Sequence, residues 1–356
     1  MTSPIKIGDK GIGAGHPTYI VAELSANHNK DYERAARIIR AAKDAGADAV
    51  KLQTYTPDTI TIASGREEFR VSGGTLWDGR TFHDLYAEAY MPWEWQPRLK
   101  NMAEDLGMDC FSSAFDASAV DFLEKMGVPA HKVASFELVD IPLIQKMART
   151  GKPLIISTGM ATIEEIDEAL QSARDAGATQ VALLKCTSAY PAPPEEMNLR
   201  TIPEMAQRFG VPVGLSDHTM GVAVPVAAVA LGSCIIEKHL TLSRSVPGPD
   251  SSFSLEPGEF KAMVDAVRIA EKALGEVNLE VNFGLGSKEE ASRAFRRSLF
   301  VVEDVEQGEA FTLANVRSIR PGNGLHPRHL TEVLGKNASQ GIKRGTPLSW
   351  EFVVRS

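Results

Sequence analysis

Residues 180–216 read QVALLKCTSAYPAPPEEMNLRTIPEMAQRFGVPVGLS, and this stretch decides the fold. Residues 180–186 form an apolar, β-rich run, whereas residues 199–210 carry apolar side chains at helical spacing. Gly210 closes the helical segment, as a left-handed C-terminal cap prefers. A second apolar run follows at once in 211–216. A strand, a helix and a further strand in this order are typical of a parallel sheet.

The same unit recurs along most of the chain. Helical segments that mostly end in glycine separate the short apolar runs. This repetition predicts an α/β fold in which alternating strands and helices close into a TIM (β/α)8 barrel. The predicted strands cover residues 18–24, 48–54, 108–113, 130–135, 153–158, 180–186, 211–216 and 233–239.

An open, doubly wound sheet is the alternative α/β architecture. It usually has fewer strands, and its dinucleotide-binding form carries a G-x-G-x-x-G sequence after the first strand. Gly11, Gly13 and Gly15 precede the first predicted strand instead, and we interpret them as part of an ordinary loop. The barrel is therefore the favoured fold.

The sequence pattern changes near residue 276. Segments such as SLFVVEDVEQGEAFT (298–312) contain short β patterns and turn signals in place of the strand–helix rhythm. We predict a barrel domain over 1–275, a linker over 276–294 and a small β-rich domain over 295–356. A long insertion, 55–90, follows the second predicted strand on the side of a barrel where active sites lie, so we expect it to be functional.

The composition is that of a soluble globular protein, with 43% hydrophobic and 24% charged residues. A net charge of −8 argues against nucleic acid as the main partner. Cys110, Cys186 and Cys234 lie in apolar runs, and we interpret them as buried thiols in a reducing compartment. The chain has neither a signal-peptide pattern at its start nor an apolar run long enough for a membrane, so we expect it in the cytoplasm.

Polar and charged residues gather where the predicted strands end. In a parallel barrel these ends surround the active-site mouth, so their clustering predicts a functional site. A lysine inside an apolar strand, as at Lys51, needs a partner because burying a lone ammonium group is costly. The strand-end residues are Glu23, Lys51, Gln53, Ser112, Ser113, Lys132, Ser135, Ser157, Thr158, Lys185, Thr187, Ser216, His218 and 237–239, with Glu137 close behind Ser135.

These residue types fit an anionic substrate together with a metal ion. Ammonium groups neutralise a phosphate or carboxylate, and hydroxyl groups hydrogen-bond to its oxygens. His218 and His239, at the ends of neighbouring strands, can converge on one divalent ion that polarises a carbonyl, with Glu23 or Asp250 assisting. The candidate anion ligands are Lys51, Lys132, Lys185, Ser112, Ser135, Ser157 and Ser216.

Other interpretations stay open on these residues alone. Lys51 can serve a structural ion pair with Glu23 or Glu137, and each histidine can be a plain hydrogen-bonding residue. A lysine in the mouth can form a Schiff base, as in a barrel aldolase. A sugar-binding barrel without catalysis is the non-enzyme alternative.

The same residues make the chain resemble the sialic acid synthase family, whose members condense phosphoenolpyruvate with an N-acetylated sugar. The resemblance covers almost the whole chain, and the C-terminal region looks like the family's SAF domain, a β-clip also called antifreeze-like. The segments that carry the resemblance are AELSANHN (22–29), GADAVKLQTYTPDT (46–59), HKVASFE (131–137), ISTGMAT (156–162), LLKCTSAYPAPPE (183–195), GLSDHT (214–219), IEKHLTL (236–242), PGPD (247–250) and RPGNGL (320–325).

The resemblance implies a role for each matching position. His218 and His239 match metal ligands, with Mn²⁺ or Mg²⁺ expected, and Glu23 matches the acid near the reacting carbons, with Glu137 as a second candidate base. Arg320 matches an SAF-domain arginine that reaches the N-acetyl group in the partner subunit's barrel, which implies a domain-swapped homodimer. The positions that match phosphoenolpyruvate ligands are Lys51, Lys132, Ser113, Ser135, Ser157 and Ser216, and those that match the sugar site are Gln53, Phe115, Glu137, Tyr190 and Asp250.

Within the family, several segments point to the branch that makes pseudaminic acid. They include SANHN (25–29), LQTYTPDT (52–59) and DLYAEAYMPWEW (84–95). Ser188 stands where members that make N-acetylneuraminate usually carry asparagine, beside the two substrates. The implied acceptor is a 6-deoxy-di-N-acetylhexose, and the product would feed flagellin glycosylation or a surface polysaccharide. Branches that make N-acetylneuraminate or N,N'-diacetyllegionaminate are the alternatives.

Overall fold

The computed structural model describes residues 2–275 and 291–354. The chain divides into two compact units, Met1–Gly275 and Glu276–Ser356, and each is described by itself. Of the predicted linker, residues 276–290 lie outside the described residues, and Ala291–Phe295 form a short 3-10 helix.

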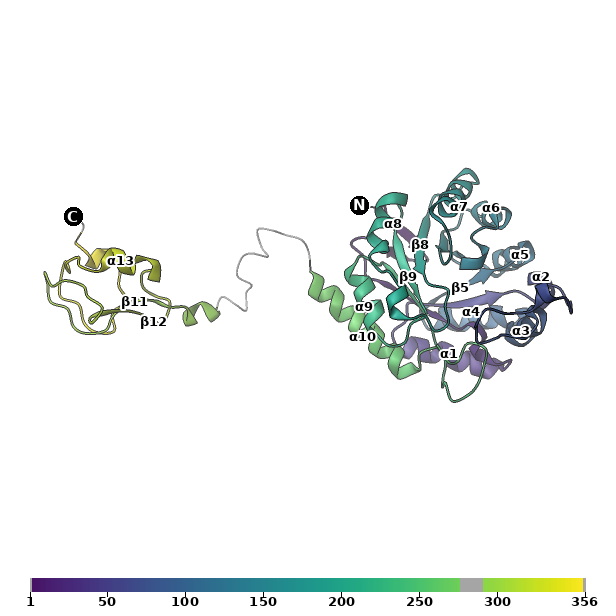
Figure 1. Ribbon diagram of the computed structural model, residues 1–356, viewed down its shortest axis with the longest axis horizontal. Helices are drawn as coiled ribbons and strands as arrows, with labels where there is room; N and C mark the ends of the chain where they lie inside the picture. Colours follow the sequence, from purple (N-terminus) through teal and green to yellow (C-terminus); the bar gives the residue numbers. More distant parts are fainter. Residues whose placement is uncertain (1, 276–290, 355–356) are drawn as a thin grey trace. The chain divides into compact units, whose positions relative to one another are not determined.

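Eight parallel strands close into a barrel in the first unit, which confirms the predicted fold (Figure 1). Each strand pairs with the next along the chain, and β10 pairs with β3 to complete the ring. His239 and Glu23 are register partners across this closure, so residues far apart in sequence meet at the mouth. The strands are β3 (Tyr19–Glu23), β4 (Ala49–Thr54), β5 (Asp109–Ala114), β6 (His131–Val133), β7 (Leu154–Ser157), β8 (Val181–Cys186), β9 (Val213–Asp217) and β10 (Ile235–His239).

Helices surround the strands of the first unit (Figure 1). Their ends follow local sequence signals. A capping box of Thr162 and Glu165 opens α7, and Gly127 closes α5 in the left-handed conformation. The helices that follow strands are α1 (Tyr32–Asp44), α4 (Gln96–Asp105), α5 (Ala117–Met126), α6 (Ile141–Ala148), α7 (Ile163–Asp175), α8 (Thr201–Phe209), α9 (Ala223–Ala230) and α10 (Pro257–Leu274).

The insertion at 55–90 contains two helices of its own, α2 (Pro57–Ile60) and α3 (Phe82–Ala89). Tyr86 of α3 packs edge-on against Tyr55, with ring centroids 5.5 Å apart. Tyr55 follows β4 directly, so this contact holds the insertion against the end of a barrel strand.

A hairpin of β1 (Ile5–Ile7) and β2 (Lys10–Ile12) precedes the barrel. Lys10 donates to Asp109, the first residue of β5, so the hairpin lies at the N-terminal end of the barrel strands, away from the mouth. The prediction of an ordinary loop is wrong for Gly11, which lies in β2. A side chain there would collide with the ring of His16, which explains why a glycine occupies this strand position.

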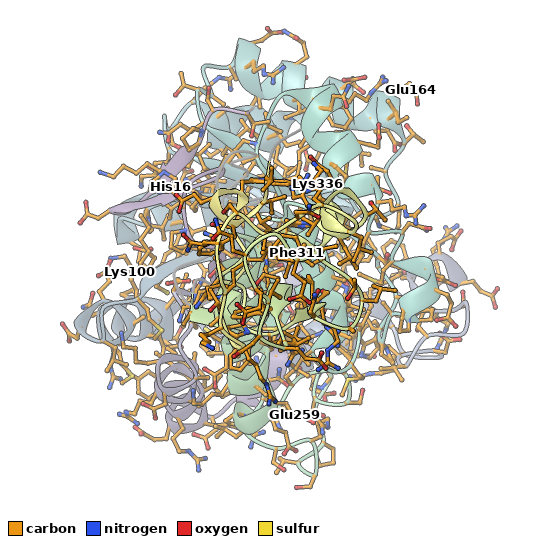
Figure 2. All side chains as sticks on the ribbon, turned by 90° about the vertical axis from the view of Figure 1, so that its left-hand side faces the viewer. His16, Lys100, Glu164, Glu259, Phe311 and Lys336 are labelled. Atoms are coloured by element: carbon orange, nitrogen blue, oxygen red, sulfur yellow. The ribbon has the colours of Figure 1, made fainter. Side chains whose placement is uncertain are left out.

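The second unit is β-rich, as predicted. Its strands β11 (Ser298–Val301) and β12 (Val316–Ile319) pair antiparallel, and a short helix, α13 (Leu330–Val333), follows them. Phe311 is fully buried and lies inside the loops of this unit, whose surface carries Lys336 (Figure 2). This unit therefore has a hydrophobic core of its own.

Two further expectations concern cysteines and membranes. Cys110, Cys186 and Cys234 are free and buried, as predicted. Within the part of the chain that the structure describes, no helix combines the length and the apolar character needed to span a bilayer.

Candidate active site

The end of β4 places an ammonium group between two carboxylates. Lys51 Nζ lies 3.0 Å from Glu23 Oε2 and 3.1 Å from Glu237 Oε1, and all three side chains are almost fully buried. Burial works against the charged ammonium, but the two carboxylates outweigh it and raise the pKa of Lys51 above its usual value. Lys51 therefore stays charged, and the ion pair with Glu23 that the sequence suggested is present.

The two carboxyl groups around Lys51 differ in protonation. Burial raises the pKa of Glu23 to about 7, which Lys51 only partly offsets. Burial also opposes ionisation of Glu237, but Lys51 and then Lys132 lower its pKa to about 2. Glu237 thus remains ionised while Glu23 can exchange a proton near neutrality. Gln53 Nε2 donates to Glu23 Oε1 at 3.0 Å and fixes its orientation.

The sequence prediction gives Glu237 no role of its own, although the structure places it at the centre of the cluster. Side chains two residues apart on a strand share a face, so Glu237 points the same way as His239. Ser216 on neighbouring β9 donates to Glu237 Oε1 at 2.9 Å. The alternation along IEKH was the signal that could have identified it.

A second lysine extends the cluster toward β6 and β7. Lys132 Nζ donates to Ser157 Oγ at 2.6 Å, and burial lowers the pKa of Lys132 to about 8. Lys51 Nζ also approaches Ser113 Oγ at 3.4 Å. Five of the six predicted phosphoenolpyruvate ligands therefore line one polar cluster: Lys51, Lys132, Ser113, Ser157 and Ser216.

Two anion candidates point away from the mouth. Ser112 shares a 2.7 Å hydrogen bond with Thr54, on the opposite face of the sheet from Ser113. Lys185 Nζ donates to the carbonyl of Cys186 at 2.9 Å, and its side chain alternates with the inward Cys186. The expectation that Ser112 and Lys185 bind an anion in the mouth is wrong, because a strand sends successive side chains to opposite faces.

His218 and His239 meet at the mouth with ring centroids 5.4 Å apart. His218 Nδ1 lies 2.9 Å from the carbonyl of Thr187, and a carbonyl only accepts, so this nitrogen carries the proton. His239 Nδ1 lies 3.2 Å from Ser25 Oγ, which gives its own proton to Asp250 at 2.5 Å. With the proton on Nδ1, the neutral form of each ring presents an unprotonated Nε2.

This donor set fits a divalent metal ion. Imidazoles whose Nδ1–H is held by an oxygen are the common form of a histidine metal ligand. Burial, and then the nearby His218, lower the pKa of His239 well below its usual value, so this ring is neutral. Across residues 2–275 and 291–354, no group of three or more His, Cys, Asp or Glu side chains is arranged to hold a metal. An ion here would have two protein ligands, with water or substrate completing its coordination.

A thiol lies against the histidine pair. Cys186 Sγ is 4.0 Å from His218 Nδ1 and 3.9 Å from Ser188 Oγ. Burial raises the pKa of this thiol, but His218 outweighs burial and lowers it to about 7. Sequence reasoning predicted the burial of Cys186 but missed its place in the mouth, although the residue ends a barrel strand.

Aromatic rings cover the histidine pair. The ring of Tyr190 lies 4.3 Å from that of His218, and the ring of Phe253 lies 5.1 Å from that of His239. Trp77, from the insertion, lies 5.7 Å from Tyr190. Aromatic faces of this kind pack well against the apolar face of a sugar. The insertion thus contributes to the mouth, and Phe253 joins the site although the sequence prediction gave it no role.

Three residues on β6–β8 loops are packed without spare room. Ser135 Oγ accepts a hydrogen bond from the amide of Gly159 at 3.2 Å. A Cβ on Gly159 would lie 2.8 Å from Ser135 Oγ and would collide with Ser188 Oγ. A side chain at position 159 would therefore require the hydroxyl groups of Ser135 and Ser188 to move.

Glu137 is a second carboxyl group with an altered pKa. Burial raises its pKa to about 7, and Lys132 only partly opposes this rise. Glu137 Oε2 is shielded from solvent and has no hydrogen-bond partner in the described residues. The ring of Tyr55 contacts both Tyr86 of the insertion and Phe115, with ring centroids 5.5 and 5.1 Å apart. Burial, and then the nearby Glu137, raise the pKa of Tyr86. The predicted sugar-site residues Phe115 and Glu137 therefore lie on the insertion side of the mouth.

We expect the Glu137→Gln variant to be more stable than the wild type at pH 7.5 and equally stable at pH 4.5. The folded state holds the Glu137 proton up to about pH 7, whereas the unfolded chain releases it near 4.5. Unfolding therefore becomes easier as pH rises between these values, by about 1–3 kcal/mol for this half-buried group. Urea unfolding from pH 4.5 to 8 measures the difference. Parallel curves for both proteins would contradict the assignment.

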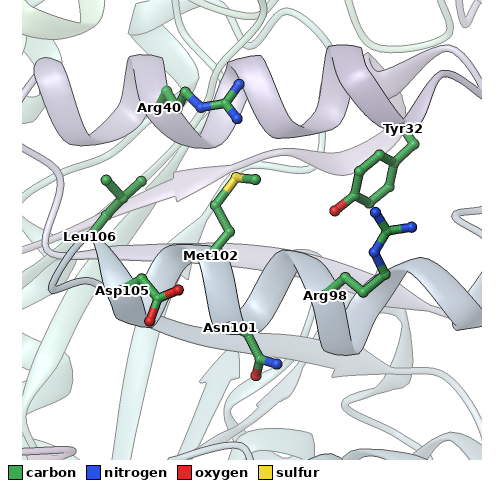
Figure 3. Close-up of a pocket in the computed structure, with 7 residues that line it drawn as sticks. All are labelled: Tyr32, Arg40, Arg98, Asn101, Met102, Asp105 and Leu106. Atoms are coloured by element: carbon green, nitrogen blue, oxygen red, sulfur yellow. The ribbon is translucent and has the colours of Figure 1, made fainter.

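Two clefts lie in the first unit, in addition to the charged cluster around Lys51. One, of about 390 Å³, lies on the outer face between α1 and α4, where Arg98 stacks 4.3 Å from the ring centre of Tyr32 (Figure 3). The other, of about 680 Å³, lies between α7 and α8 and is lined by residues that include Met160, Lys185 and Met205. The candidate site is therefore identified by its charged residues, not by cavity size.

Arg320 belongs to the second unit. It follows β12 directly and its side chain is exposed. An exposed arginine is free to reach another surface, and its predicted contact with a sugar in the partner subunit's barrel stays a prediction.

The chain is similar to known proteins over almost its whole length. A model of the NeuB family matches residues 38–278, and a model of the SAF domain matches residues 296–354. Pseudaminic acid synthase from Helicobacter pylori is 45% identical over 96% of this chain and 99% of its own length. Pseudaminic acid synthase from Campylobacter jejuni is 47% identical over 93% of this chain and 95% of its own length.

The relationship also extends to solved structures. The crystal structure of the spore coat polysaccharide biosynthesis protein SpsE from Bacillus subtilis superposes with a TM-score of 0.67 at 33% identity. The match covers 99% of this chain and 100% of that one, and so includes both units. The family model and these relatives lead to one conclusion: the chain belongs to the NeuB family and carries an SAF domain at its C-terminal end.

Proposed function

We propose that this protein condenses phosphoenolpyruvate with 2,4-diacetamido-2,4,6-trideoxy-altropyranose and water, giving pseudaminic acid and phosphate. The observation that carries the proposal is the buried cluster of Lys51 between Glu23 and Glu237, beside the paired rings of His218 and His239. The names of relatives at 45% and 47% identity support the choice of sugar.

The lysines hold the phosphate and carboxylate of phosphoenolpyruvate. Lys51 and Lys132 bring two ammonium groups, and Glu237 compensates one of them. A neutral Glu23 then leaves the cluster with an excess of positive charge, which favours an anion. The hydroxyl groups of the four serines Ser113, Ser135, Ser157 and Ser216 complete the set of donors.

Glu23 and Glu137 act in the reaction at carbon 2 of phosphoenolpyruvate. Carbon 3 of the enol attacks the open-chain aldehyde of the sugar, and positive charge develops at carbon 2. Glu23 gives its proton to the aldehyde oxygen and, once ionised, stabilises that charge. Water then adds to carbon 2, and Glu23 or Glu137 accepts the proton. Phosphate then leaves with cleavage of the carbon–oxygen bond. A carboxyl group with a pKa of about 7 suits these proton transfers near neutrality.

His218 and His239 would hold Mn²⁺ or Mg²⁺ through Nε2. When bound, the ion supplies Lewis-acid polarisation of the aldehyde. The chain's own contribution is orientation, because Thr187 and Ser25 hold the Nδ1 side of each ring.

The sugar lies against Tyr190, with Gln53, Phe115, Asp250 and Ser188 around it. Asp250 accepts from both the hydroxyl of Ser25 and the amide of Ala26, so it is oriented before substrate arrives. We also propose that Arg320 of the partner subunit contacts the N-acetyl group, in a domain-swapped homodimer. Because phosphoenolpyruvate is made in the cytoplasm, we place the enzyme there, upstream of flagellin or surface-polysaccharide glycosylation.

A phosphate-release assay tests the proposal. Purified enzyme with Mn²⁺ and phosphoenolpyruvate is expected to release phosphate with the altro-configured 6-deoxy-di-N-acetylhexose, and at least about 100-fold more slowly with N-acetylmannosamine. In ¹⁸O-labelled water the label is expected in the nine-carbon acid and absent from the phosphate. Faster turnover of the legionaminate precursor or of N-acetylmannosamine would reassign the branch.

The same mixture separates the alternative functions. Trapping of a lysine by borohydride would favour a Schiff-base aldolase, and full activity after EDTA treatment would contradict the metal site. Thermal stabilisation by both substrates without phosphate release would indicate a binding protein.

A further inference from the structure

A second buried ion pair lies directly behind the two histidines. Lys238 Nζ is 2.5 Å from Asp217 Oδ2, and neither side chain has any exposed surface. The two residues are register partners on neighbouring strands β9 and β10. Each immediately precedes one of the histidines, His218 or His239, in the sequence.

The pair lies on the face of the sheet opposite to the mouth. Ser216 and Glu237 are bonded to each other inside the barrel, so their neighbours Asp217 and Lys238 point outward, toward the helices. Two residues earlier on the same face, the register partners are apolar, Leu215 and Ile236. The outer face therefore changes from apolar to ionic at the last position before the histidines.

The bonds of this pair enclose the backbone that carries His218. Asp217 Oδ1 accepts from the amide of Thr219 at 2.9 Å, and Lys238 Nζ donates to the carbonyl of Thr219. Both neighbours of His218 are thus tied to the residue that precedes His239. We name the three residues Asp217, Thr219 and Lys238 the clamp.

A clamp of this kind is poorly explained by stability. Desolvating two charges costs several kcal/mol, and apolar residues of similar volume usually serve a core equally well or better. What the charged pair adds is a set of directional bonds at fixed positions. Two histidines that bind the same metal ion need such precision, because small displacements of their rings weaken the binding of the ion.

We propose that Asp217 and Lys238 are positioning residues that fix the spacing of His218 and His239 from behind the sheet. The proposal rests on the function proposed above, in which these histidines hold a divalent ion. Inside the mouth, Thr187 and Ser25 orient the rings about their own axes. The clamp acts on a different variable, the distance between the two backbones that bear the rings.

The test compares Mn²⁺ binding in three full-length, metal-stripped proteins. The clamp variant combines Asp217→Asn with Lys238→Met, which removes both charges together and avoids an unpaired buried ion. The matched control is Lys10→Met, which breaks a 2.9 Å lysine–carboxylate pair at the opposite end of the barrel. Mn²⁺ affinity is measured by calorimetry, and kcat and KM for phosphoenolpyruvate are measured at saturating Mn²⁺.

We expect Mn²⁺ to bind the clamp variant about 10- to 100-fold more weakly than the wild type, with the control unchanged. Saturating Mn²⁺ is expected to restore much of kcat while KM for phosphoenolpyruvate stays within about 2-fold, because the lysines of the mouth are untouched. An affinity within about 2-fold of the wild type in a folded clamp variant would overturn the proposal. If the double variant does not fold, Asp217→Leu combined with Lys238→Met, which fills the same space with apolar side chains, gives the same comparison.

A second measurement needs no metal. Histidine-selective ¹⁵N spectra of the metal-free proteins report the ring environment of each imidazole. The clamp variant is expected to shift or broaden the His218 and His239 signals, whereas Lys10→Met leaves them in place. Unchanged ring signals would count against the clamp even if wild-type protein bound no Mn²⁺, and that failure to bind would separately contradict the proposed metal site.

Discussion

Replacing Lys51 with methionine is expected to abolish phosphate release and to lower the free energy of unfolding by about 3–5 kcal/mol. Methionine has a similar length, so little packing is lost. What remains is a pair of buried carboxyl groups, Glu23 and Glu237, without the ammonium that lay within 3.1 Å of both. Urea unfolding at pH 7.5 measures the loss of stability.

The pH dependence of this loss identifies its cause. Acid protonates the two carboxyl groups, so the deficit of Lys51→Met should shrink as pH falls from 7.5 to 5. Adding Glu23→Gln and Glu237→Gln should recover most of the stability and none of the activity. Lys152→Met, which breaks a partly exposed pair with Glu124, is the control and should cost less than about 1 kcal/mol. A pH-independent deficit would assign the effect to packing.

Mixing two inactive variants is expected to restore activity. Arg320→Ala removes the arginine of the SAF domain, and His239→Ala removes a proposed metal ligand of the barrel. If Arg320 completes the site of the partner subunit, a mixed dimer has one complete site and one that lacks both groups. Co-expression in equal amounts should recover about a quarter of wild-type activity, because half of the dimers are mixed and each has one working site.

The control for this experiment pairs His218→Ala with His239→Ala. Both changes lie in the barrel, so every site in the mixture lacks a histidine and activity should stay absent. A lack of recovery in the Arg320→Ala mixture would mean that Arg320 acts within its own chain or not at all. The recovered activity should also require co-expression or refolding, because subunits exchange slowly once a swapped dimer has formed.

Much of the barrel could be predicted because its signals are local. Each strand is a short apolar run, and glycines such as Gly127 and Gly210 mark the helix ends that precede the next strand. The strand β2 could not be predicted in this way, since a lysine, a glycine and one isoleucine form no strand pattern. Its pairing depends on contact with β1 and with Asp109, which lies about a hundred residues further along the chain.

The sequence could predict which residues form the candidate site, but not which way their side chains point. The ends of the strands are visible in the sequence, and Glu23, Lys51, Lys132, His218 and His239 meet there as expected. Which face each side chain takes depends on the register of the barrel. Lys185 and Cys186 show the difference, because the lysine chosen from the sequence points outward and the neglected cysteine points into the mouth.

The close packing around Gly159 has a consequence for enzyme engineering. A designer who wants to redirect sugar choice would first exchange Ser188, yet its hydroxyl already occupies the space where a side chain on Gly159 would stand. A larger residue at 188 must share this space with Ser135, whose Oγ lies 2.8 Å from the same point. Libraries that vary position 188 together with Ser135 should therefore sample more folded, active enzymes than libraries that vary position 188 with Gly159.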